Sequence, residues 1–196
     1  YLDRLLPLRN SGEVLMETAR HLALWMTYED AIRVADLKTR RTRFARVGDE
    51  VCLRPAQLLD INEFMHPRIE EIADILAAGL GRWLLRSPMG RGVLGPFTRK
   101  GRVIRTSSVG GFLQLYTIAS MRRWRRGSLR FQVEHERVGA WLSQVERLAN
   151  RDPALALEVV KAQRLVKGYG DTHARRWSNF QKLMGALPRL GQQTGG

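Results

Sequence analysis

Arginine is the residue type with the clearest capacity for chemistry in this sequence. Four arginines flank one tryptophan in the run Arg122-Arg123-Trp124-Arg125-Arg126. A guanidinium group binds a carboxylate or a phosphate through two parallel hydrogen bonds, so this run is typical of an anion contact. If it ends a helix, interaction with the helix dipole explains one or two of the cations but not four. We therefore weigh a solvated helix end and a bound carboxylate or phosphate as equal alternatives.

A second candidate site is the corner Lys167-Gly168-Tyr169-Gly170-Asp171-Thr172-His173. If a helix begins here, its N-terminal amide groups can bind an anion, and Lys167, Tyr169 and His173 would surround it. The simpler interpretation is a turn between two helices with Asp171 as the N-cap. That interpretation explains the glycines and the aspartate, but not the cations gathered at the same corner.

Other reaction chemistry is poorly represented. The four histidines show no H-x-x-x-H or H-E-x-x-H spacing, and the sequence contains no G-x-S-x-G or Walker A motif. A lone Cys52 excludes an internal disulfide and a cysteine-ligated zinc or iron–sulfur site. We predict no catalytic and no metal-binding residue, and we expect that this chain alone is not an enzyme.

The positive charge is concentrated in the second half of the chain. The whole sequence holds 33 Lys and Arg against 19 Asp and Glu, a net charge of +14, and residues 99–196 hold 19 basic against 6 acidic residues. Residues 99–130 contain nine basic residues and no acidic one. Such a block repels itself unless an anion lies against it. Nucleic acid, a phosphate-bearing ligand, an acidic protein partner and an acidic remainder of a longer chain all remain open.

The segments that must position these residues show mainly the apolar periodicity of helices. We predict a mainly α bundle of about six helices with one long N-terminal helix, over residues 13–47, 67–86, 108–126, 128–150, 153–166 and 171–187. The Gly- and Pro-rich residues 87–105 are predicted to form an exposed loop. Their G-x-G-x-x-G match at 90–95 lacks the preceding strand that a dinucleotide site requires. The tryptophans fall in predicted helices, where we expect most of them to anchor the core.

The length predicts one α-helical domain over residues 1–190 and a flexible Gly-rich tail over 191–196. No run of 18 apolar residues is present, so we expect no membrane span, and the low cysteine content favours the cytoplasm. The sequence begins with Tyr1 rather than Met. We therefore expect a fragment of a longer subunit.

Several segments together resemble a known family. They are TARHLALWM at 18–26, YED at 28–30, RVADLK at 33–38 and LVKGYGDTH at 165–173. These blocks resemble the C-terminal helical region of the indolepyruvate ferredoxin oxidoreductase family, beta-subunit type. The resemblance covers about residues 15–180 of this sequence.

The resemblance implies a role in a thiamine-diphosphate-dependent 2-oxoacid oxidoreductase. Such enzymes oxidatively decarboxylate aryl-pyruvates to acyl-CoA with coenzyme A, and pass the electrons to ferredoxin or a similar acceptor. It also implies that thiamine diphosphate and the iron–sulfur clusters are bound elsewhere, and this sequence has no thiamine G-D-G motif. We expect an accessory or assembly domain that contacts other domains or subunits of an oligomeric enzyme. The alternative from another class is a basic nucleic-acid-binding helical protein, suggested by a pI of about 11.2.

Overall fold

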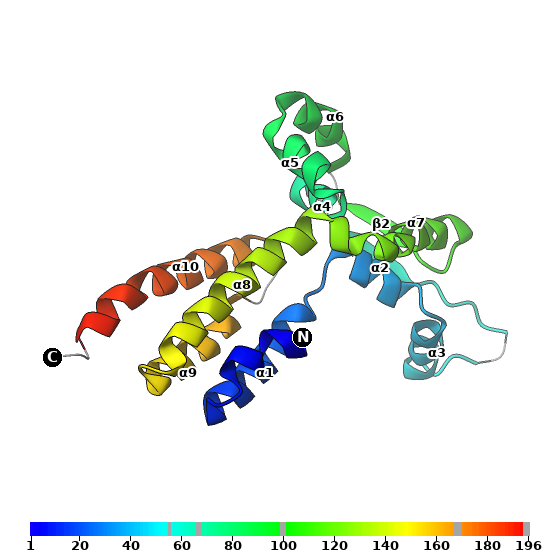
Figure 1. The fold of residues 1–196 in the computed structure, drawn as a ribbon. Coiled ribbons are helices and arrows are strands. Elements are labelled where there is room, and N and C mark those ends of the chain that lie inside the picture. The colour runs from blue at the N-terminus through cyan, green and yellow to red at the C-terminus, as the bar shows by residue number, and fades with distance from the viewer. Residues whose placement is uncertain (55, 66–67, 99–100, 167–169, 194–196) are drawn as a thin grey trace. The chain divides into compact units, whose positions relative to one another are not determined.

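The computed structural model describes residues 1–54, 56–65, 68–98, 101–166 and 170–193. It confirms a mainly α chain, with one two-stranded sheet among the described residues (Figure 1). The sequence predicted one domain over residues 1–190, and the contacts divide the chain into two compact units. Unit 1 comprises residues 1–28 and 136–196, and unit 2 comprises residues 29–135. No helix in the described ranges is long and apolar enough to cross a membrane.

Unit 1 is a helical assembly in which α1 packs against α9, and α10 packs against the short helix η5. Its elements are η1 (Leu2–Arg4), η2 (Leu6–Leu8), α1 (Gly12–Met26), the C-terminal part of α8 (Leu129–Ala149), α9 (Pro153–Lys161), η5 (Ala162–Val166) and α10 (Gly170–Gln193). Asp152 caps α9 by accepting the Leu155 N–H at 2.9 Å, and Pro153 occupies the first turn, as the sequence predicts.

An aromatic cluster forms the centre of the unit 1 core. The rings of Trp25 and Trp141 lie 5.5 Å apart, and Phe180 of α10 meets Trp25 edge-on at 5.8 Å. The Trp141 indole N–H donates to the Val159 carbonyl at 3.0 Å, which satisfies its only polar atom. Beside this cluster the buried His21 pairs through Nδ1 with Gln163 Oε1 at 3.0 Å.

Unit 2 has two small cores. Its elements are α2 (Ala31–Lys38), α3 (Arg41–Glu50), β1 (Asn62–Met65), α4 (Ile69–Ile75), α5 (Ala78–Arg86), α6 (Pro88–Thr98), β2 (Arg102–Arg105), α7 (Val109–Ser120), η3 (Met121–Arg123), η4 (Arg125–Gly127) and the first residues of α8. In one core α2 packs on α7, with Ala35 against Leu115 and Ala119, and the inner face of the antiparallel β1–β2 pair covers them. In the other, α4, α5 and the start of α8 meet around Ala73 and Leu129.

The predicted long N-terminal helix over 13–47 is wrong, because three helices occupy this stretch. The Asp30 side chain accepts the Arg33 N–H at 2.7 Å and thereby starts α2, four residues after α1 ends at Met26. Arg40 has extended backbone angles and separates α2 from α3. Continuous helical periodicity hid these breaks, because an aspartate inside an apolar repeat fits a helix surface as well as an N-cap.

The predicted loop over 87–105 is also wrong in most of its length. Pro88 begins α6, which contains the glycines of the G-x-G-x-x-G match, and β2 follows at 102–105. The expected helix over 67–86 is divided into α4 and α5, and the one over 108–126 changes to short 3-10 turns after Ser120. At the C-terminus α10 continues through Gln193, so the first residues of the expected tail are helical.

Candidate functional site

The arginine run forms a compact turn at the end of α7, residues 121–127, which we call the Arg-Trp turn. It consists of η3 and η4, and Gly127 leads through Ser128 into α8. Arg125 is the residue that fixes the turn. Its Nε donates to Asp30 Oδ2 at 2.6 Å, and the Asp30 side chain retains only 3% of its exposure. The carboxylate that caps α2 is therefore the same one that holds the turn.

A second carboxylate of α2 also reaches the turn. Asp36 Oδ1 lies 3.5 Å from Arg122 Nη1, while Asp36 Oδ2 accepts from Arg33 at 3.3 Å and from Arg40 at 2.6 Å. Arg122 is mostly exposed, so this pair contributes little energy by itself. The sequence did not identify Asp30 or Asp36 as partners of the arginine run. The N-cap pattern at Asp30 could have indicated that residue, whereas no pattern marks Asp36.

The remaining members of the Arg-Trp turn point to solvent. Arg123 and Arg126 are exposed, and neither forms an ion pair with the described part of the chain. Trp124 is 72% exposed, so it does not anchor the core as Trp25 and Trp141 do. The turn thus presents two cations and one large aromatic surface on a backbone that α2 holds in place.

Carboxylates of unit 2 pair with several arginines of the acid-free block over residues 99–130. Five carboxylates from other segments pair with four of its arginines, namely Asp30 with Arg125, Asp36 with Arg122, Asp60 with Arg105, and both Asp74 and Glu134 with Arg130. Charge repulsion therefore does not by itself require an external anion. Unit 2 nevertheless keeps 20 basic against 11 acidic residues, a net charge of +9.

The anion site predicted at Lys167, Tyr169, Asp171 and His173 remains a prediction. Lys167 and Tyr169 lie outside the described residues. Asp171 and His173 belong to the first turn of α10 by their backbone, and the description of the chain does not extend to their side chains. This corner belongs to unit 1 and the Arg-Trp turn to unit 2, so each is considered by itself.

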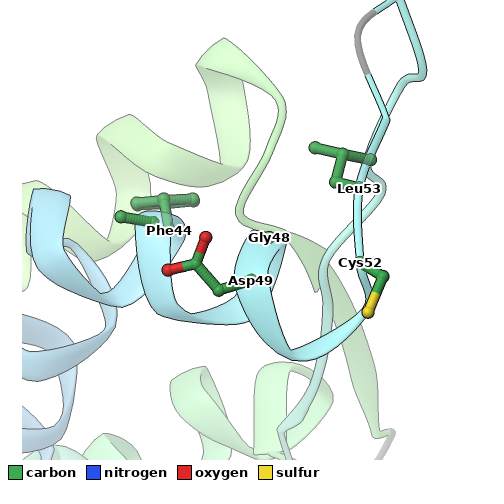
Figure 2. Close-up of a pocket in the computed structure, with 6 residues that line it drawn as sticks. Phe44, Gly48, Asp49, Cys52 and Leu53 are labelled. Atoms are coloured by element: carbon green, nitrogen blue, oxygen red, sulfur yellow. The ribbon is translucent and has the colours of Figure 1, made fainter.

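A surface depression with a volume of about 470 Å³ lies next to α3. Phe44, Ala45, Gly48, Asp49, Cys52 and Leu53 line it. Figure 2 shows the Cys52 thiol pointing away from the Asp49 carboxylate. The pair is therefore not arranged as a nucleophile and its base. Across the described ranges, no three His, Cys, Asp or Glu residues are grouped to hold a metal ion.

Comparison with curated proteins finds no match to this chain, and comparison with solved structures finds none. One family model does match, described as a family of unknown function (DUF6537), and it spans residues 1–186. Since the match covers nearly the whole sequence, the chain belongs to the DUF6537 family.

Proposed function

We propose that this chain is a non-catalytic accessory domain of an indolepyruvate ferredoxin oxidoreductase-like enzyme, which oxidatively decarboxylates 2-oxoacids to acyl-CoA. In this proposal the domain contacts other domains or subunits of an oligomeric cytoplasmic enzyme, and the Arg-Trp turn is one of those contacts. The sequence blocks at 18–38 and 165–173 support the enzyme class by resemblance. The exposed Arg123, Trp124 and Arg126 on a fixed turn are the observation that supports a docking role.

The pairing within the turn favours docking over a solvated helix end. Arg125 is held to α2 by its ion pair with the buried Asp30 carboxylate, so the turn is ordered before any partner arrives. An ordered loop loses less conformational entropy on binding than a flexible one. Arginine and tryptophan are also the residue types that contribute most to protein interfaces. An acidic protein surface with room for one indole ring fits this combination.

The redox cofactors of the proposed enzyme belong to other parts of it. An iron–sulfur cluster takes about four cysteine thiolates, and this chain supplies only Cys52. The residues present therefore do not fit a cluster of their own. We place thiamine diphosphate, the clusters and the contact with ferredoxin or a similar acceptor outside this chain, and we assign none of its residues a catalytic role.

The double variant R123A/R126A in the intact enzyme tests the docking role. Both side chains are exposed and outside the internal ion pairs, so we expect the domain to keep its fold. Loss of two charge-assisted contacts is expected to weaken assembly about tenfold or more. Assembly is measured by analytical ultracentrifugation, together with turnover as a function of the concentrations of coenzyme A and electron acceptor.

The matched control is R147A/R151A, which removes two exposed cations from unit 1 and leaves the same net charge. Equal effects of the two double variants, or no effect of R123A/R126A on assembly and kinetics, would exclude the turn as a contact.

The nucleic-acid alternative predicts binding to nucleic acid with an affinity that falls steeply as the salt concentration rises. A filter-binding assay that detects no affinity at about 50 mM salt would remove that alternative.

A further inference from the structure

We infer that α7 provides a second docking surface, which receives an amphipathic helix bordered by acidic residues. This inference rests on the proposed function, because it places that helix in another part of the same enzyme. Its apolar residues lie outside the Arg-Trp turn, and two arginines of that turn, Arg123 and Arg126, supply the charge at one end. Three features of α7 carry it, namely its composition, the position of its exposed residues and the cations that follow its C-terminal end.

The twelve residues of α7 contain no charged side chain. One face, with Gly111, Leu115 and Ala119, is buried against α2 and the strands. The exposed residues include the uncharged Gln114, Thr117 and Ser120, whereas a helix at a protein surface normally presents charged residues on its exposed face. The composition of α7 thus indicates that a second surface covers its outer face.

The outer face of α7 carries a stripe of apolar residues. Val109 is 78% exposed, Leu113 53% and Tyr116 56%. At about 100° per residue, their four- and three-residue spacing places them within an arc of about 60° over a length of about 10 Å. Side chains spaced in this way form a ridge that fits the groove of a second helix. The geometry therefore points to a helix as the occupant.

The charges around α7 indicate which side chains the bound helix carries. The exposed Arg123 and Arg126 follow the C-terminal end of α7, and Arg105 precedes its N-terminal end with its carboxylate partner 3.7 Å away. A second copy of this unit would bring a net charge of +9 against another +9. Nucleic acid would place phosphates along twelve residues that offer no cation. An acidic amphipathic helix complements both the apolar stripe and the cations at the C-terminal end of α7.

Photo-crosslinking in the intact purified enzyme tests this inference. Benzoylphenylalanine is introduced at position 113, with a control at position 16, where Met16 is an exposed apolar residue of unit 1. The crosslinked peptide is identified by mass spectrometry. We expect a helix with apolar residues at i, i+3, i+4 and i+7 and flanking Asp or Glu. The variant Y116E should reduce the yield from position 113 about tenfold. The matched variant Q114E adds the same charge on a different side of α7 and should change the yield less than about twofold.

The outcomes separate this inference from the proposed function. An acidic helix that lies in a 2-oxoacid oxidoreductase polypeptide supports both. An acidic helix from an unrelated protein supports the docking surface and overturns the enzyme assignment. A yield no higher than at position 16, a crosslink to α7 of another copy, or equal effects of Y116E and Q114E would overturn the docking surface. In those cases the assembly assay of R123A/R126A still decides the role of the Arg-Trp turn.

Discussion

Replacing Arg125 with alanine removes the cation that holds the Arg-Trp turn to α2. The Asp30 carboxylate, at 3% exposure, would keep one hydrogen bond, from the Arg33 N–H, and would lose its ionic partner. Breaking a buried ion pair by removing one member costs about 3–5 kcal/mol. Because the Arg125 side chain is 27% exposed, and therefore partly solvated, we expect R125A to lower the stability of unit 2 by about 2–3 kcal/mol.

The variant D30N supplies the comparison that identifies the cause. Asparagine caps a helix about as well as aspartate, so D30N keeps the start of α2, removes the buried charge and replaces the oxygen that accepts from Arg125 by an NH2 group. In the D30N background the loss of Arg125 no longer leaves a carboxylate unpaired. R125A should then cost about 1 kcal/mol, which gives a coupling energy of about 1–2 kcal/mol between the two positions. R123A, at an exposed position of the same turn, should cost less than about 0.5 kcal/mol.

Hydrogen exchange at increasing urea concentration measures this stability for one unit at a time. Because the contacts divide the chain into two compact units, we expect the units to unfold separately, and a single two-state curve for the whole chain would then mix them. The exchange rates of amides in α2 and α7 measure the stability of unit 2. With a slope of about 1–3 kcal/mol per M urea, the expected loss of about 2–3 kcal/mol lowers their midpoint by about 0.7–3 M. An equal cost of R125A in the unmodified chain and in the D30N background would refute the reasoning. A cost below about 0.5 kcal/mol in the unmodified chain would refute it as well.

Two further expectations concern packing. A methyl group at Gly111 would overlap the Arg105 carbonyl, whereas Gly110 has nothing within 4 Å, so G111A should cost about 1–3 kcal/mol and G110A should be neutral or slightly stabilising in the same exchange experiment. In unit 1, Q163L removes the hydrogen-bond partner of the buried His21 Nδ1 and should lower the thermal stability by about 1–3 kcal/mol. The double variant H21L/Q163L should recover part of that loss, and no recovery would contradict the assigned pairing.

Local signals in the sequence were sufficient where a residue acts on its own neighbours. Asp152 and Pro153 specify the start of α9 through an N-cap bond and a preset backbone angle, and the prediction there is confirmed. The same approach failed between Met26 and Arg41, where periodicity continues across two helix breaks. It also failed at residues 88–98, because the glycines and prolines that favour a loop are accommodated in α6 by packing against α5 and α4.

The Arg-Trp turn likewise combines features that the local sequence predicts with features that depend on the tertiary structure. Composition alone located the charge, the arginine run and the absence of acids around it, because these are properties of consecutive residues. Composition could not distinguish Arg125 from Arg123, since the two differ in whether a carboxylate of the described chain lies opposite. Asp30 is 95 residues away from Arg125 in the sequence, and α2 packing on α7 brings them to 2.6 Å. Side-chain type thus determined that this segment binds anions. The tertiary packing decided which arginines pair with the chain's own carboxylates and which stay exposed, because those carboxylates come from distant segments.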